Sequence, residues 1–230
     1  MRLTRGFVFA VMACVLPFMN SAYADLVKGR DYSIIEPAQP VGGGGKIEVL
    51  AFFWYGCPHC IRLEPKLNEW LKRIPADVDF KRVPAAFRES WLPLARAQYA
   101  LQALGLADKL HGELFSAIHE RKALDIKTLG ADPAPLFDWM AANGVDRKEF
   151  ADAYNSPAVA ARAKNTIGTT KKYALPDVPA VVINGRFLIA PSMAAYSDGD
   201  RKNYDLLFRN IDQLIAQARR NIPQKRPGTQ

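Results

Sequence analysis

Hydrophobic residues follow two different periods along this chain. The segment 46–54 closes in an unbroken apolar run, rich in β-branched and aromatic side chains, which predicts a strand buried on both faces. Apolar residues then recur at helical spacing over 61–74, and residues 78–83 have the alternation of a strand. The pattern therefore predicts a strand–helix–strand unit over 47–83.

The middle of the chain, from residue 88 to residue 173, has helical spacing throughout and no fixed repeat period. A segment of about 80 residues lies in the lower size range of domains, so we expect an inserted helical domain. The four predicted helices lie over 91–101, over 110–119, after the pair Asp132–Pro133, and from the pair Ser156–Pro157 onward.

Strand patterns return after the helical segment. The runs 180–183 and 186–189 flank Asn184–Gly185, a dipeptide that strongly favours a two-residue hairpin. The fold class is therefore α/β, with a central mixed sheet and a helical domain inserted after the strand–helix–strand unit. Two further predicted elements are an edge strand over 32–35 and a last amphipathic helix over 201–219.

The first 24 residues have the three parts of a secretory signal peptide. Arg2 and Arg5 precede an apolar run over 7–16, and a small-residue cleavage pattern, Ala-Tyr-Ala, ends at Ala24. The apolar run is shorter than the roughly 20 residues that span a bilayer, which favours cleavage over an uncleaved membrane anchor. We expect an exported mature chain that begins at Asp25 and enters an oxidising compartment.

Composition and charge narrow the class of protein. The chain is 49% hydrophobic, which supports a packed core and excludes a wholly disordered or collagen-like chain. Its net charge of +8 falls to +6 when two arginines leave with the signal peptide. Basic residues do not interleave with aromatic ones along the chain, so we expect no nucleic-acid partner. The expected segments are the signal peptide (1–24), the first part of the sheet domain (25–87), the inserted helical domain (88–173), the second part of the sheet domain (174–220) and a disordered basic tail (221–230).

Removal of the signal peptide takes Cys14 with it and leaves two cysteines, Cys57 and Cys60, at the start of the first predicted helix. One helical turn brings their sulfurs close enough to bond, and the free N–H groups and positive dipole end of a helix N-terminus stabilise a thiolate. Pro58 suits the first helical turn, and His59 can add positive charge or donate a hydrogen bond to the sulfur. A lowered thiol pKa makes the disulfide a stronger oxidant, by about 30 mV per pKa unit, so the pair indicates disulfide donation.

Two other uses of this cysteine pair compete with redox chemistry. A structural zinc site takes four ligands, and His59, His111 and His119 lack the paired spacing of such a site, so we expect no metal. We expect His111 and His119 to be surface or core residues. A static disulfide in so small a ring removes little entropy from the unfolded chain. The strand–Cys-x-x-Cys–helix context favours a redox pair that needs no dissociable cofactor.

The segment 52–60, Phe-Phe-Trp-Tyr-Gly-Cys-Pro-His-Cys, resembles the thioredoxin superfamily and, within it, the periplasmic DsbA oxidoreductases. The later Val178-Pro179-Ala180 and Asn184-Gly185 are similar to that family as well. Because the helical insertion also matches, the resemblance covers essentially the whole mature chain. It implies a thioredoxin fold, a periplasmic location and a strongly oxidising disulfide.

The resemblance implies a role for each matching residue. Cys57 is then the exposed nucleophile that carries the mixed disulfide, Cys60 its buried partner, and His59 the main stabiliser of the thiolate. Pro179 is a cis-proline that faces the cysteines, and Val178 shapes a groove in which an extended substrate pairs with exposed backbone. From the residues alone, Pro179 is equally compatible with an ordinary turn.

The chain departs from the DsbA pattern at Ala51, where members of that family often carry a buried acid on the strand before the active site. Glu64, one turn after Cys60, is a candidate for a second acidic position that assists deprotonation of Cys60. From the residues alone, Glu64 is most simply a solvated helix residue.

We therefore expect a thiol:disulfide interchange protein that donates the Cys57–Cys60 disulfide to reduced, unfolded exported proteins. By resemblance, a quinone-linked membrane oxidase of the DsbB type reoxidises it, and we expect a monomer. Two alternatives remain open: a periplasmic disulfide isomerase or reductase, and a non-catalytic binding or chaperone module with a structural disulfide. The pKa and accessibility of the Cys57 thiol discriminate between them.

Overall fold

A computed structural model describes residues 25–42, 44–198 and 201–221. The predicted signal peptide over 1–24 and residues 222–230 of the predicted basic tail lie outside the described residues. Within the described ranges, no helix is both long and apolar enough to cross a membrane.

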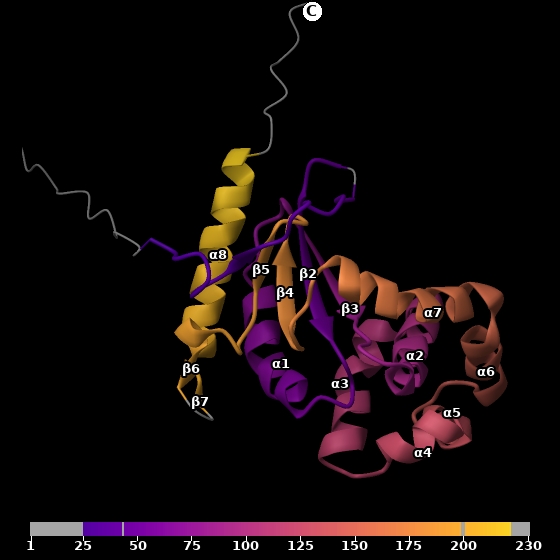
Figure 1. Cartoon of the computed structure of the whole chain (residues 1–230). Coiled ribbons are helices and arrows are strands. Elements are labelled where there is room, and N and C mark those ends of the chain that lie inside the picture. Colours follow the sequence, from indigo (N-terminus) through magenta and orange to yellow (C-terminus); the bar gives the residue numbers. More distant parts are fainter. Residues whose placement is uncertain (1–24, 43, 199–200, 222–230) are drawn as a thin grey trace, which may run out of the picture.

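A five-stranded mixed sheet runs through the middle of the molecule, in the order β1-β5-β4-β2-β3 (Figure 1). Its strand β2 pairs in parallel with β3 and antiparallel with β4, so the helix between β2 and β3 is a crossover connection. The predicted mixed sheet and the predicted edge position of the first strand are confirmed. The strands are β1 (Ser33–Ile34), β2 (Ile47–Phe53), β3 (Val78–Pro84), β4 (Ala180–Ile183) and β5 (Phe187–Ile189).

Strand β2 is buried along its whole length, because helices cover both faces of the sheet. Val49 and Ala51 belong to one hydrophobic cluster with α1 (Pro58–Leu71) and α8 (Tyr204–Asn221). Leu50 and Phe52 belong to a second cluster with the helices between β3 and β4. This alternation follows from the two-residue period of a strand, and Figure 1 shows α8 on one side of the sheet and α2, α6 and α7 on the other.

Six α-helices lie between β3 and β4 in the described chain, two more than the hydrophobic pattern predicts. The additional helices are α4, capped by the Asp125 carboxylate, and α6, capped by that of Asp146. They bury only one and two side chains, respectively, which is too few for a periodic hydrophobic signal. The six helices are α2 (Leu92–Ala103), α3 (Ala107–His119), α4 (Ile126–Ala131), α5 (Ala134–Ala142), α6 (Arg147–Asn155) and α7 (Pro157–Lys172).

The hairpin between β4 and β5 is confirmed. Asn184 and Gly185 both have positive φ, 49° and 64°, as a tight hairpin turn of this kind requires. The N–H of Arg186 donates to the carbonyl of Ile183 at 3.1 Å and closes the turn.

The start of the last helix differs from its prediction. Residues 201 and 202 do not begin the helix but form strand β7 (Arg201–Lys202), which pairs with β6 (Ser197–Asp198). Asn203 then accepts the N–H of Leu206 at 2.9 Å through its side chain and caps α8. The helix therefore begins at Tyr204, because the capping residue decides where the helical hydrogen bonds start.

Candidate active site

Cys57 lies where the chain leaves β2 and enters α1. It is the N-cap residue of α1, and Pro58 occupies the predicted first helical position. A proline is tolerated there because the N–H that it lacks would have no hydrogen-bond partner within the helix. The carbonyl of Cys57 accepts the N–H of Cys60 at 3.1 Å. The Cys57 thiol donates to the carbonyl of Val178 at 3.3 Å, so the start of β4 adjoins the cysteine pair.

Gly56 permits the close turn that precedes Cys57. A Cβ atom at Gly56 would lie 2.4 Å from the ring of Trp54, so a larger residue would displace that ring. The Trp54 ring stacks on Trp91 with a centroid separation of 3.9 Å, and the exposed Phe87 packs edge-on against Trp91 at 5.4 Å. Three aromatic side chains therefore pack in series beside the turn that leads to Cys57.

The two cysteines are free thiols, and both are buried: the exposure expected for Cys57 is wrong, since 7% of its surface is exposed, against 2% for Cys60. Their pKa values shift in opposite directions. A hydrogen bond with the Cys60 thiol, together with the backbone N–H groups of Cys60 and His59, lowers the pKa of Cys57 from 9.0 to about 7, against the effect of burial. Burial and the neighbouring Cys57 sulfur raise the pKa of Cys60 well above its ordinary value. Cys57 is therefore the thiol that ionises first and can act as the nucleophile.

His59 is exposed, and its Nδ1 atom lies 2.7 Å from a guanidinium nitrogen of Arg62 on the next turn of α1. Because a guanidinium has only donors, Nδ1 accepts this hydrogen bond and carries no proton. The group of His59 that acts on Cys57 here is its backbone N–H. The role expected for the imidazole as the main stabiliser of the thiolate stays a prediction.

Val178 and Pro179 are buried directly before β4, and the peptide bond between them is cis. The carbonyl of Val178 already faces the Cys57 thiol. The structure thus brings these two residues to the cysteine pair, although they lie about 120 positions later in the chain. Their part in a substrate groove stays a prediction.

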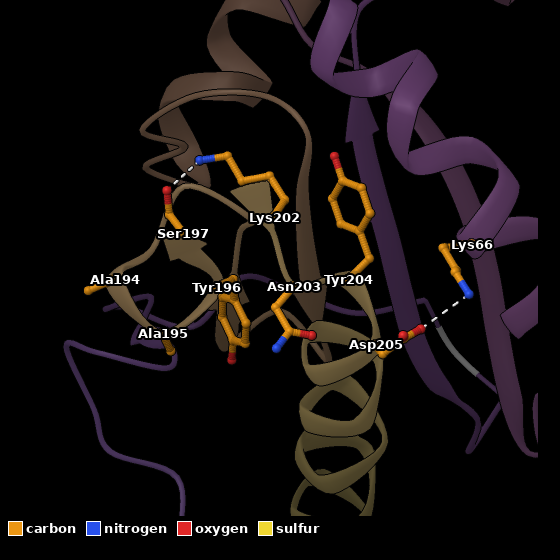
Figure 2. Close-up of a pocket in the computed structure, with 9 residues that line it drawn as sticks. All are labelled: Lys66, Ala194, Ala195, Tyr196, Ser197, Lys202, Asn203, Tyr204 and Asp205. Atoms are coloured by element: carbon orange, nitrogen blue, oxygen red, sulfur yellow. Dashed lines mark hydrogen bonds and ion pairs between the residues drawn. The ribbon is translucent and has the colours of Figure 1, made fainter. Parts of the chain in front are cut away.

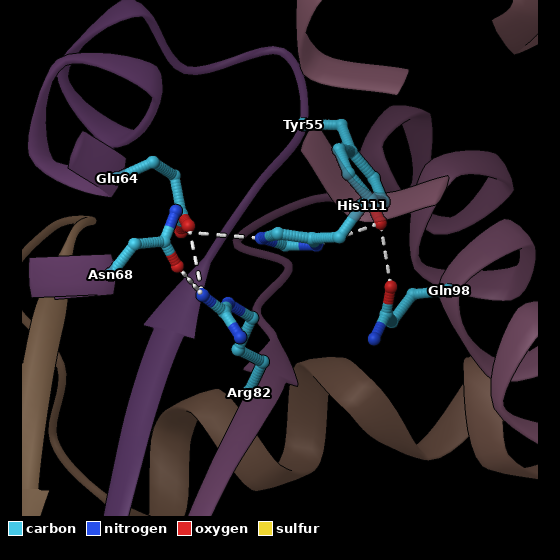
Figure 3. Close-up of polar contacts among 6 residues, drawn as sticks. All are labelled: Tyr55, Glu64, Asn68, Arg82, Gln98 and His111. Atoms are coloured by element: carbon cyan, nitrogen blue, oxygen red, sulfur yellow. Dashed lines mark hydrogen bonds and ion pairs between the residues drawn. The ribbon is translucent and has the colours of Figure 1, made fainter. Parts of the chain in front are cut away.

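Glu64 is not the solvated helix residue that its sequence context suggests. Its side chain is only 12% exposed, Oε2 accepts from Arg82 at 3.0 Å, and Oε1 lies 3.2 Å from Nε2 of His111 (Figure 3). Burial acts to raise the pKa of Glu64, but the hydrogen bonds and charges of His111 and Arg82 outweigh it and lower that pKa below its usual value. Glu64 also lines a small internal cavity together with Cys60.

His111 is a site residue that the sequence alone did not assign. It is a core residue of α3, one of the two placements expected, and its Nδ1 lies 3.0 Å from the Tyr55 hydroxyl. That hydroxyl donates to Oε1 of Gln98 at 2.6 Å (Figure 3). Tyr55 adjoins the cysteine motif, but no sequence signal links it with His111 or Gln98, which come from helices of the insertion.

No group of three or more His, Cys, Asp or Glu side chains within 25–42, 44–198 and 201–221 is placed to hold a metal ion. A separate surface pocket lies at the start of α8, where Lys66 of α1 forms an ion pair with Asp205 at 3.2 Å (Figure 2). Neither cysteine lines this pocket, so it is distinct from the thiol site.

Residues 45–198 match the family model described as Thioredoxin. The thiol:disulfide interchange protein DsbA of Burkholderia cepacia is 38% identical over 184 residues, which are 80% of this chain and 84% of the relative. The chain belongs to the DsbA family. The DsbA protein of Pseudomonas aeruginosa is similar too, with 36% identity over 77% of this chain and 82% of the relative.

Solved DsbA structures share the fold of this chain. The crystal structure of the oxidoreductase DsbA from Xylella fastidiosa has a TM-score of 0.74 and 33% identity, covering 85% of this chain and 98% of that one. Pseudomonas aeruginosa DsbA has a TM-score of 0.73 and 31% identity, covering 84% and 94%. The expected thioredoxin fold is confirmed, and the activity of the chain is that of a thiol:disulfide oxidoreductase.

Proposed function

We propose that this DsbA-family protein donates the Cys57–Cys60 disulfide to reduced, unfolded exported proteins. A substrate thiolate attacks the Cys57 sulfur, the Cys57–Cys60 bond breaks, and its electron pair leaves on the Cys60 sulfur, which then takes up a proton. A second substrate thiolate attacks the substrate sulfur of the mixed disulfide and releases the Cys57 thiolate. The substrate loses two electrons and gains a disulfide, while the protein becomes a dithiol.

The observation that carries this proposal is the opposite ionisation of the two thiols. A Cys57 pKa of about 7 makes its thiolate a good leaving group in the second exchange, since a thiol of lower pKa leaves faster. The lowered pKa also stabilises the reduced form of the protein, so its disulfide is a stronger oxidant than it would be if Cys57 had the ordinary thiol pKa. Glu64, which shares a cavity with Cys60, assists proton exchange at the buried sulfur.

The site is suited to an extended polypeptide substrate. The backbone at Val178 lies against the Cys57 sulfur, where a substrate strand can pair with it, and Pro179 shapes that surface. We place the protein in the periplasm as a monomer and assign its reoxidation to a quinone-linked membrane oxidase of the DsbB type.

A periplasmic reductase or isomerase is the second candidate, because a reductase such as thioredoxin also has a nucleophilic thiol with a pKa of about 7. The direction of electron flow separates the two. A disulfide donor has a reduction potential nearer to about −120 mV, and a reductase has a reduction potential nearer to about −270 mV.

The deciding experiment combines oxidative refolding with a redox titration. Oxidised mature protein is mixed with a reduced, unfolded test protein that needs disulfides, and recovery of the test protein's activity is followed. The potential is measured in parallel by equilibration with glutathione. We expect refolding and a potential above about −180 mV. No refolding, together with a potential near that of thioredoxin, would overturn the donor assignment.

A further inference from the structure

A chain of hydrogen bonds connects the neighbourhood of Cys60 to helix α3. Glu64, four residues after Cys60 on α1, lies 3.2 Å from Nε2 of His111, whose Nδ1 lies 3.0 Å from the Tyr55 hydroxyl. Tyr55 in turn donates to Oε1 of Gln98 at 2.6 Å. Figure 3 shows these side chains in one row, with the His111 ring between the Glu64 carboxylate and the Tyr55 hydroxyl.

The hydrogen bonds that connect Glu64, His111, Tyr55 and Gln98 require a transferable proton. A tyrosine hydroxyl has one proton, and the amide oxygen of Gln98 can only accept a hydrogen bond. The Tyr55 hydroxyl therefore donates its proton to Gln98 and can only accept a hydrogen bond from His111. The 3.0 Å contact with Tyr55 therefore needs an N–H on Nδ1 of His111. The contact between Nε2 and Glu64 then needs a second proton, on the ring or on the carboxyl. The pair therefore makes both contacts at once only when it holds one proton more than a carboxylate with a neutral imidazole, and the lowered pKa values of both groups make that proton easy to release.

The position of Glu64 connects this pair to the Cys60 sulfur. Glu64, Arg82 and Cys60 line the same internal cavity, and its other lining residues are apolar. Because a guanidinium does not give up its proton, Glu64 is the proton carrier among the residues that line this cavity with Cys60. Glu64 and Arg82 also line an outer pocket together with His111, and this pocket opens to solvent. The pair therefore lies between the buried sulfur and water.

We propose that His111 is a positioning residue for the chemistry of Cys60: it shares with Glu64 the proton that Cys60 takes up when the disulfide opens and returns when the disulfide reforms. This inference rests on the proposed function, because it assigns the proton exchange of that same reaction. On opening, the Cys60 thiolate accepts the proton through Glu64, leaving a carboxylate and a neutral imidazole. Water in the outer pocket then restores the proton to the pair.

The charges around His111 suit a proton that is easily given up. Burial is the largest effect and lowers the pKa of His111, and the charge of Arg82 on β3 acts in the same direction. The carboxylates of Glu64 on α1 and Asp108 on α3 act in the opposite direction. The Tyr55 hydroxyl also contacts His111, and burial raises its pKa well above the ordinary value, so it stays protonated.

The test isolates the step in which Cys60 must lose its proton. The reduced protein is converted to a mixed disulfide of Cys57 with glutathione, and release of glutathione by Cys60 is followed from about pH 5 to pH 9. We expect His111→Gln to slow this release at neutral pH by about tenfold, because Gln can hydrogen-bond but cannot carry the proton. We also expect the rate to rise more steeply with pH in this variant, since solvent must then take the proton. Glu64→Gln should be at least as slow, and the double variant no slower than Glu64→Gln.

His119→Gln is the matched control. His119 lies on the same helix and its Nε2 is 2.7 Å from the carbonyl of Tyr55, but within the described residues it forms no hydrogen bond with Glu64 or His111. We expect its release rate to follow the pH profile of the unmodified protein.

Two results would overturn the proposal: an unchanged pH profile in His111→Gln, or a decrease by the same factor at every pH, which marks a purely structural role. If His111→Gln fails to fold, Tyr55→Phe decides, because it removes the acceptor of the Nδ1–H. We expect that variant to slow release in the same pH-dependent way, and an unchanged profile there would equally overturn the proposal. Because the step is intramolecular and needs no protein substrate, its outcome is independent of the refolding experiment that tests disulfide donation.

Discussion

Cys57 and Cys60 have the same side chain and lie one helical turn apart, yet their thiols have opposite properties. Cys57 is the N-cap residue of the helix, where the Cys60 thiol and, after it, backbone N–H groups stabilise its thiolate and lower its pKa to about 7. Cys60 lies inside the helix with 2% of its surface exposed, and burial raises its pKa. The position of a thiol relative to the helix end, rather than its chemical type, therefore decides which sulfur attacks and which one leaves.

The largest expected effect comes from removing one cysteine at a time. Cys57→Ser should abolish disulfide transfer, because Cys57 carries the mixed disulfide. Cys60→Ser should still react with a substrate disulfide at Cys57, but the adduct should accumulate because no second thiol resolves it. Non-reducing gels with a disulfide-containing test protein measure both outcomes.

Circular dichroism of the two serine variants provides the control, since a serine hydroxyl is nearly the size of a thiol. Transfer activity in Cys57→Ser, or adducts formed equally well by both variants, would contradict the division of roles between the cysteines.

A smaller effect is expected from His59→Ser. Loss of the imidazole should raise the pKa of Cys57 and weaken the disulfide as an oxidant. Because the backbone N–H groups remain, we expect a rise of about one pKa unit or less, which corresponds to at most about 30 mV. Thiolate absorbance against pH and equilibration with glutathione measure the two quantities.

Arg62→Gln is the matched variant for His59→Ser, because it removes the guanidinium that binds Nδ1 and keeps the imidazole. A change in potential for Arg62→Gln but none for His59→Ser would show that the charge of Arg62, not the imidazole, acts on the sulfur.

The pH dependence of stability should report the Cys57 thiolate directly. The pKa of Cys57 is about 7 in the folded dithiol and 9.0 ordinarily, so between these pH values the unfolded chain binds more protons and stability rises with pH. Relative to reduced Cys57→Ser, the reduced protein should gain about 1 kcal/mol in the free energy of unfolding from about pH 6 to about pH 8. This contribution is lost as the pH falls through about 7.

Urea unfolding of both reduced proteins at the two pH values measures this difference. Equal pH dependence of the two proteins would show that the Cys57 thiolate is not stabilised by the fold.

The smallest effect is expected from Asp177→Asn. The carboxylate of Asp177 raises the pKa of Cys57 through charge repulsion with the thiolate. The amide of Asn has nearly the same shape without the charge, so the pKa of Cys57 should fall by a few tenths of a unit. The thiolate absorbance titration used for His59→Ser detects the direction, and a rise in the pKa would contradict this role of Asp177.

The strand–helix–strand unit and the Asn184–Gly185 hairpin could be predicted because their signals are local. An unbroken apolar run, a proline in the first helical turn and an Asn-Gly pair each specify backbone geometry within a few residues. The short helices α4 and α6 were missed because their stability depends on capping carboxylates and on one or two buried side chains.

The environment of Glu64 could not be predicted in the same way. On its own helix it is a charged residue one turn from Cys60, which is typical of a solvated position. Arg82 comes from β3 and His111 from α3, so the contacts that bury Glu64 arise only when these elements pack together.

The sequence by itself determined the redox pair, the family and the position of Cys57 at a helix start, because motif and helix signals act over neighbouring residues. Tertiary structure decided the rest of the chemistry. It brought Val178 to the Cys57 sulfur across 121 positions and placed His111 of the insertion on Glu64 across 47. Contacts between such distant residues depend on how helices and sheet pack, and no local pattern encodes that packing.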